Sequence, residues 1–111
     1  MKYYLGDRFL FVDMHQHYTH CVVEGDRLVS CQKSWEEAQQ VASIIRAQRT
    51  EKLNEMKELL QKGHAYTTPK QTAYGIDLRD LYPTAGLLNA GIRRIEKTIR
   101  SIQVKPLRVE A

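Results

Sequence analysis

The sequence predicts an α+β domain in which an N-terminal four-stranded antiparallel meander is followed by a long helix, a long loop and a basic amphipathic C-terminal helix. Short apolar runs in residues 2–32 are broken twice by Gly-Asp-Arg, and residues 34–62 and 84–103 carry apolar residues at helical spacing. Neither pattern occurs in residues 63–83. We therefore expect one domain, with a meander at 1–33, helices at 34–62 and 84–103, a loop at 63–83 and a tail at 104–111.

Two similar stretches, YLGDRFLF at 4–11 and VEGDRLVS at 23–30, predict two hairpins. Glycine readily adopts the positive φ that a two-residue hairpin turn needs. Such turns fix the register, so Cys21 should face Ser30 and Cys31 should face His20. The two thiols would then lie on opposite faces of the sheet, which argues against a disulfide. A three-residue turn would instead place Cys21 opposite Cys31.

A middle turn at residues 16–17 would join the hairpins into one sheet with two unlike faces. The face that the helices cover would hold Leu5, Leu10, Val12, Met14, Cys21, Val23 and Leu28. The other face would hold Tyr4, Phe9, Phe11, Val22 and Val29 among charged residues. A face that is both aromatic and charged is either partly covered or a contact surface.

The long helix should begin at Ser34, because Ser34 and Glu37 have the spacing of a capping box. Its apolar stripe lapses at residues 46–52 and resumes at Leu53. A helix over residues 34–62 would be about 43 Å long. Two alternatives follow: the helix bends near residues 48–52, or it projects as an arm, which would allow a homodimer through the long helix.

The C-terminal helix has the clearest pattern. Its apolar stripe consists of Leu88, Ile92, Ile95, Ile99 and Ile102. Opposite this stripe, Arg93, Lys97 and Arg100 fall within about 60° of one another, with Arg94 nearby. We call these four cations the basic stripe. It is either an ordinary solvated helix face or a surface that binds phosphate or an acidic protein.

The loop at 63–83 interleaves aromatic and basic residues. Tyr66, Lys70, Tyr74 and Arg79 could stack on and neutralise a nucleic-acid strand. The alternative is a loop held to the domain by its tyrosines. Together with the basic stripe, these residues make 66–100 the candidate region for partner or phosphate binding.

The stretch FVDMHQHYTH at 11–20 is the candidate metal site, with His15, His17 and His20 as candidate ligands. Asp-x-His-x-His after an apolar strand resembles the first-strand metal motif of the amidohydrolase and related metal-dependent phosphoesterase barrels. That resemblance implies a bound zinc that acidifies a water for hydrolysis. Those folds need at least twice this length, and His64 is the only other histidine. We therefore predict no catalytic residue, no metal and no cofactor, and interpret the motif as a polar turn.

Composition narrows the function further. The apolar runs are too short to span a membrane and the N-terminus lacks the features of a signal peptide, so we expect a cytoplasmic protein with no membrane partner. Residues 62–111 carry nine Lys and Arg against four Asp and Glu, a charge of +5, whereas residues 1–61 carry eight against nine, so the net charge of +4 comes from the second half. An acidic partner should therefore bind the second half of the chain.

The function that we expect is that of a small regulatory or inhibitory binding module without enzymatic activity, of the kind found among phage-type accessory proteins. It would engage a nucleic-acid-handling protein. The first alternative is direct nucleic-acid binding through residues 66–100. The second is a metal-dependent hydrolase that uses His15 and His17.

Overall fold

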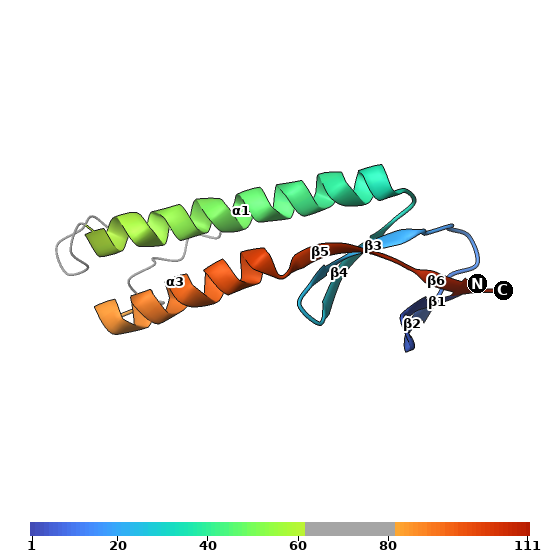
Figure 1. The fold of residues 1–111 in the computed structure, drawn as a ribbon, viewed down its shortest axis with the longest axis horizontal. Coiled ribbons are helices and arrows are strands. Elements are labelled where there is room, and N and C mark those ends of the chain that lie inside the picture. The colour runs from blue at the N-terminus through green and yellow to red at the C-terminus, as the bar shows by residue number, and fades with distance from the viewer. Residues whose placement is uncertain (62–81) are drawn as a thin grey trace. The chain divides into compact units, whose positions relative to one another are not determined.

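The computed structural model describes residues 1–61 and 82–111, which form two compact units (Figure 1). The first unit contains residues 1–46 and 101–111, and the second contains residues 47–100. Helix α1 (Trp35–Gln61) is uninterrupted and contributes its first part to one unit and its second part to the other. The α+β class is confirmed. Nearly all of the predicted loop, residues 63–81, lies outside the described residues.

The first unit contains two three-stranded antiparallel sheets. Their strands are β1 (Lys2–Leu5), β2 (Arg8–Val12), β3 (His20–Glu24), β4 (Arg27–Gln32), β5 (Ile102–Pro106) and β6 (Arg108–Glu110). The strand order is β2-β1-β6 in one sheet and β4-β3-β5 in the other. The two predicted hairpins are therefore present, and each gains a third strand from the C-terminal segment.

The predicted four-stranded meander is wrong, because β2 pairs with β1 and β3 pairs with β4 and β5, while β2 and β3 lie in different sheets. Residues 13–19 form a loop between them instead of a tight turn at 16–17. The predicted tail is also wrong. Ile102 and Val104 of β5 pack in the core of this unit, and Val109 of β6 pairs with β1. Ile102 and Val104 are both β-branched, which favours a strand, and their packing beside β3 explains why residues 102–106 form a strand instead of a free tail.

Both hairpins have the predicted two-residue turn, followed by a bulge that the sequence did not predict. Gly6 and Gly25 have φ values of 61° and 63°, and no other described residue has positive φ, which matches a type II′ turn. Beyond each turn the register shifts by one residue, leaving Leu10 unpaired in β2 and Val29 unpaired in β4. As a result Cys21 lies opposite Cys31, and the predicted Cys21–Ser30 pairing is wrong.

The core of the first unit lies between the β4-β3-β5 sheet and the first half of α1. Val22 and Ile102 pack against Ala38 and Ala42, whose small side chains allow the helix to lie close to the sheet. The helix begins as predicted: Ser34 Oγ accepts the Glu37 N–H at 3.1 Å, and a Glu37 carboxylate oxygen accepts the Lys33 N–H at 3.4 Å. The two side chains therefore satisfy backbone donors at the start of α1.

The predicted assignment of sheet faces needs correction. Val22, which we placed on the aromatic and charged face, is fully buried under α1. Val12 and Met14, which we placed in the core, are exposed, with 75% of Met14 accessible. Both errors follow from treating the hairpins as one sheet with an unbroken alternation, since a bulge reverses the faces of all residues beyond it.

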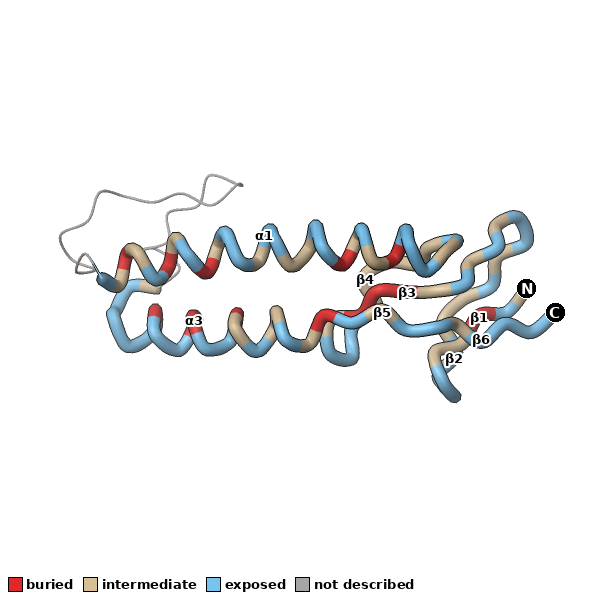
Figure 2. Tube along the Cα trace, turned by 45° about the horizontal axis from the view of Figure 1, so that its top comes forward, coloured by how far each residue is buried: buried red, intermediate tan, exposed pale blue. Residues whose placement is uncertain are grey.

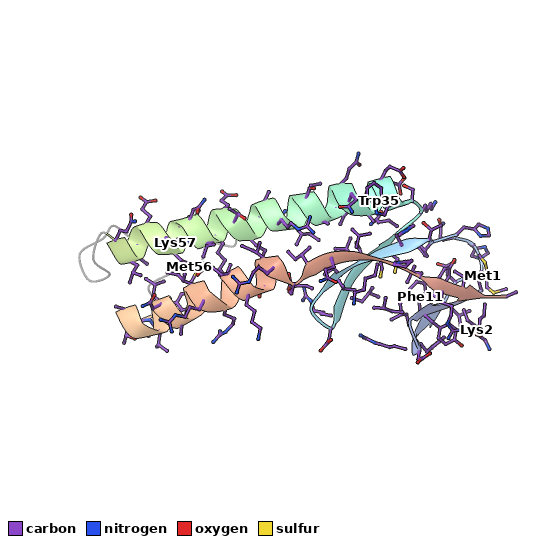
Figure 3. All side chains as sticks on the ribbon, in the orientation of Figure 1. Met1, Lys2, Phe11, Trp35, Met56 and Lys57 are labelled. Atoms are coloured by element: carbon purple, nitrogen blue, oxygen red, sulfur yellow. The ribbon has the colours of Figure 1, made fainter. Side chains whose placement is uncertain are left out.

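The second unit is built on the second half of α1 and on helix α3 (Ala85–Arg100). Leu53, Met56 and Leu59 of α1 pack against Leu88, Ile92 and Ile95 of α3. Met56 points from α1 towards α3 in Figure 3, and the buried positions of the two helices face each other in Figure 2. The predicted burial of this apolar stripe is therefore confirmed.

Helix α3 is shorter than predicted at both ends. Thr84 caps it, because Thr84 Oγ1 accepts the Leu87 N–H at 3.1 Å. The helix ends at Arg100, so Ile102, which we counted in the helical stripe, belongs to β5 and to the core of the first unit. Among the described residues, no helix is both long and apolar enough to cross a lipid bilayer.

Gly91 provides the space in which α3 packs. A Cβ atom there would lie 2.5 Å from the Tyr82 ring and 2.9 Å from the Met56 methyl carbon. We therefore expect Gly91→Ala to lower the free energy of unfolding by about 1–3 kcal/mol through overpacking. Gly86 is the matched control, since its nearest such neighbour is the Thr84 hydroxyl at 4.0 Å. Gly86→Ala should stabilise by up to about 1 kcal/mol. Urea denaturation followed by circular dichroism measures both, and equal effects would contradict this packing.

The apolar side of α3 should dominate the stability of the second unit. Ile95 is 8% exposed and packs in its core, so Ile95→Ala should cost roughly 2–5 kcal/mol. Ile44 of α1 is 58% exposed, and Ile44→Ala should change stability by about 0.5 kcal/mol or less. Denaturation midpoints compare the two variants, and an unchanged midpoint for Ile95→Ala would show that this residue is not part of a packed core.

Candidate functional site

The basic stripe lies on the side of α3 that faces away from its core. Arg93, Arg94, Lys97 and Arg100 are all exposed, while the apolar residues on the other side of the helix are buried. Helical periodicity separates the two sets, so the cations are accessible while the apolar side holds the helix in place. The role of these four residues in binding stays a prediction.

The stripe has no carboxylate partners among the residues that the structure describes. The ion pairs of Arg27 with Glu24 and of Arg108 with Glu110 lie in the first unit, and neither involves the stripe. Lys97 and Arg100 lie in the last turn of α3, where positive charge also interacts favourably with the helix dipole. Arg93 and Arg94 lie before this last turn, and no ion pair within residues 1–61 and 82–111 gives them a structural role.

The net charge of the protein is confined to the second unit. Residues 1–46 and 101–111 carry seven Lys and Arg and seven Asp and Glu, and so are neutral overall. Residues 47–100 carry ten and six, which gives the whole net charge of +4. Within this unit, residues 47–61 of α1 are balanced at three and three, whereas α3 has four cations and one Glu. The positive potential should therefore be strongest along α3.

An exposed leucine adjoins the stripe, and the sequence analysis did not single it out. Leu87 is 52% exposed and lies seven residues before Arg94, which places the two on the same side of the helix about two turns apart. The apolar stripe of α3 recurs at alternating spacings of four and three residues from Leu88, and Leu87 does not belong to that series. This offset was the signal in the sequence that Leu87 lies on another side of the helix. Protein interfaces combine apolar side chains at their centre with polar and charged side chains at their rim. Leu87 beside the basic stripe matches that combination.

The other predicted binding residues belong to the predicted loop at 63–83. Tyr66, Lys70, Tyr74 and Arg79 lie outside the described residues, so their role stays a prediction. Tyr82, from the same tyrosine-containing stretch, is described and half-buried. It packs against the core of the second unit, beside Gly91. This tyrosine therefore has a packing role.

The histidines lie in and beside an ordered loop between β2 and β3. Asp13 Oδ1 accepts the backbone N–H groups of His15 and Gln16 at 2.8 and 3.0 Å, and these hydrogen bonds lower the pKa of Asp13. His15 and His17 are exposed, whereas His20 lies at the start of β3 with its Nδ1 2.8 Å from the Thr19 hydroxyl. Within residues 1–61 and 82–111, no three His, Cys, Asp or Glu side chains gather where they could hold a metal ion.

An aromatic cluster anchors this loop from the inside. The rings of Tyr3 and Phe11 stack with centroids 4.9 Å apart, and the Tyr18 ring packs edge-on against both. Tyr3 is fully buried, and its hydroxyl donates to the Gln16 carbonyl at 2.6 Å and accepts the Tyr18 N–H at 3.2 Å. The loop that carries His15 and His17 is thus held by ring packing and hydrogen bonds.

The predicted aromatic contact face loses Phe11 to this cluster. Tyr4 and Phe9 remain on the other face of the β2-β1-β6 sheet, with ring centroids 5.6 Å apart. The Arg108 guanidinium lies 4.1 Å above the Tyr4 ring, and Arg108 also pairs with Glu110. Phe9 is 53% exposed, but the surrounding charges belong to the neutral unit and already include an ion pair. The basic stripe is therefore the stronger candidate surface.

Comparisons with known proteins add no relative. No family model matches the sequence, and the searches of curated proteins and of solved structures each found no significant match. The function of this chain must therefore be inferred from its own residues.

The Tyr3 hydroxyl should be essential for the order of the 13–19 loop. Tyr3→Phe leaves the partly buried Gln16 carbonyl and Tyr18 N–H without their partner, and should lower the free energy of unfolding by about 1–3 kcal/mol. Tyr4→Phe is the matched control, because among the described residues the Tyr4 hydroxyl makes no hydrogen bond. Hydrogen exchange at the Tyr18 amide should accelerate in Tyr3→Phe alone. Unchanged exchange would mean that the loop is held by other contacts.

Proposed function

We propose that the protein is a small regulatory or inhibitory binding module without enzymatic activity, which docks onto an acidic surface of a partner protein through the basic stripe of α3. The observation that carries the proposal is the placement of the charge. A chain that is neutral in one unit concentrates its positive charge on the exposed side of one helix in the other. Such a surface attracts an acidic partner and orients it during association.

Leu87 favours a protein over a nucleic acid as the partner. Protein interfaces bury apolar side chains at their centre and place charges at their rim. Phosphate contacts, in contrast, use cations and polar donors and gain nothing from an exposed leucine. We propose that the partner is a protein that handles nucleic acid. Cations at this helical spacing could then also contact the phosphates of a nucleic acid that the partner binds.

Nucleic acid is the second candidate, and the same stripe supports it. Three of the four cations lie within about 60° on one side of α3, and no carboxylate pairs with them among the described residues. A duplex that bound four such cations would show a steep dependence of affinity on salt, with a slope of about −0.9 per phosphate contact. The two candidates therefore differ in a quantity that can be measured.

The partner can be captured at the surface itself. A photo-crosslinking amino acid at Ala90, which is exposed on α3 one turn before the stripe, should capture the partner in cells of the native host. The same group at Ser43, which is exposed on α1, is the control. A protein crosslinked from Ala90 and not from Ser43 provides the ligand for the affinity measurements, alongside a fluorescent DNA duplex of arbitrary sequence.

Reversing the stripe should weaken binding without unfolding the protein. We expect Arg93→Glu, Lys97→Glu and Arg100→Glu together to weaken partner binding by roughly tenfold to a hundredfold, mainly through slower association at low salt. The matched control reverses Lys2, Lys33 and Lys57, which are exposed on other elements, and changes the net charge equally. If both triple variants lose the same affinity, the loss is explained by net charge alone. An unchanged affinity in the variant with the reversed stripe would contradict the proposal.

Leu87→Ala then separates the two partner classes. If the ligand is a protein that buries Leu87, this variant should weaken binding and leave the salt dependence unchanged. If the ligand is DNA, Leu87→Ala should have no effect, while the triple reversal should reduce the salt slope by about one unit per lost phosphate contact. Exposed substitutions of this kind change stability by about 0.5 kcal/mol or less, so the effect on binding can be measured on folded protein.

A further inference from the structure

The bulge in β4 brings the two cysteines of the chain to opposite positions on neighbouring strands. Glu24 pairs with Arg27 and Val23 with Leu28, but beyond the unpaired Val29 the register places Cys21 opposite Cys31. Without the bulge, Cys21 would face Ser30, and the thiols would point to different faces. One unpaired residue thus converts two distant thiols into a cross-strand pair.

The spacing of this pair suits a disulfide. Residues that lie directly opposite in an antiparallel pair have Cα atoms about 4.5–5.5 Å apart, within the range of about 4.4–6.8 Å found for disulfides. Their Cβ atoms are typically about 4.5–5.5 Å apart, compared with about 3.5–4.5 Å in a disulfide. A movement on the order of 1 Å would close the bond, and the pairing of the strands limits the change to the side chains and their immediate backbone.

The two thiols are free and differ in accessibility. Cys21 is fully buried, whereas Cys31 is partly exposed. Burial raises the pKa of Cys21, an effect that the charge and backbone N–H of Lys105 oppose. Burial also raises the pKa of Cys31 to about 11, and the neighbouring Cys21 adds to the rise. An oxidant should therefore reach Cys31 first, and the reaction at neutral pH should be slow, because the thiolate is the reacting species.

We propose that Cys21 and Cys31 form a reversible cross-strand disulfide that joins β3 to β4 when the protein meets a small-molecule disulfide such as oxidised glutathione. The Cys31 thiolate attacks one glutathione sulfur and releases the first glutathione thiol, which leaves a mixed disulfide on Cys31. The Cys21 thiolate then attacks Cys31 Sγ and releases the second glutathione thiol. Two protein thiols lose two electrons and two protons, and one small disulfide is reduced to two thiols.

The bond would act on the part of the first unit that supports α1. Cys31 lies three residues before Ser34, which caps α1, and Val22, next to Cys21, packs against the first half of this helix. A disulfide restricts the unfolded chain and holds the hairpin in its bulged register. The oxidised protein should therefore resist unfolding in this unit. The basic stripe belongs to the other unit, so the proposal is independent of the function proposed above.

Intact-mass analysis under denaturing, non-reducing conditions tests the proposal on the full chain. Incubation with oxidised glutathione should remove about 2 Da from the monomer, and the Tm should rise by about 10 °C. Dithiothreitol should reverse both changes. Cys21→Ser and Cys31→Ser should show neither. A stable glutathione adduct without the loss of mass, a disulfide-linked dimer, or no reaction under conditions that oxidise the urea-unfolded chain would each overturn the proposal.

Moving the second cysteine by one residue tests the register. In the double variant Ser30→Cys, Cys31→Ser, the relocated thiol lies opposite Val22 and on the other face from Cys21. This variant should therefore form no internal disulfide under conditions in which the native chain does. In a hairpin without the bulge the result would be reversed, because position 30 would then face Cys21. Closure of the double variant in preference to the native chain would overturn both the register and the proposed bond.

Discussion

The first unit depends on pairing between the two N-terminal hairpins and the last residues of the chain. An isolated two-stranded hairpin is marginally stable in water, and β1–β2 and β3–β4 are both of this kind. Each becomes a three-stranded sheet only when β5 pairs with β3 and β6 pairs with β1. Leu107 joins β5 to β6, and its N–H donates to the Thr19 carbonyl at 2.9 Å. The link between these two strands is therefore itself hydrogen-bonded to the residue before β3. Pairing between residues this distant in sequence generally makes folding slower than the formation of local hairpins.

The second unit separates the residues that hold it together from the residues that it presents. Because of the helical periodicity, Leu88, Ile92 and Ile95 lie on the side of α3 that packs against α1, and the basic stripe lies on the opposite side. Because the apolar side already buries its residues, the cations carry little of the folding free energy and are free to vary with the needs of binding. In the neutral first unit the exposed charges are balanced, and its stability comes from strand pairing and the packing of Val22 and Ile102. This division supports the proposal that α3 carries the binding surface, while the sheets stabilise the fold.

Local signals in the sequence predicted local structure well. The Gly-Asp turns, the capping box at Ser34 and the apolar stripe of α3 each depend on residues within a few positions of one another, and all three are present. The errors concern pairing between distant segments. Residues 102–110 resemble a tail because their partners, β3 and β1, lie some eighty or more positions earlier, and no local pattern reveals that pairing. For the candidate site, the exposure of the basic stripe followed from periodicity, whereas the exposed Leu87 and the opposition of Cys21 and Cys31 required the structure.

The two bulges show how one local device shapes both sheets. In each hairpin a type II′ Gly-Asp turn is followed by an unpaired residue four positions after the glycine, Leu10 in one and Val29 in the other. A bulge increases the twist of a strand and reverses the faces of the residues beyond it. In the first hairpin this shift moves Phe11 opposite Tyr3, where the two rings stack and support the loop that carries His15 and His17. In the second hairpin the same shift moves Cys31 opposite Cys21. The aromatic anchor and the thiol pair are therefore consequences of the same kind of register shift, which an unbroken alternation of residues along the strands does not predict.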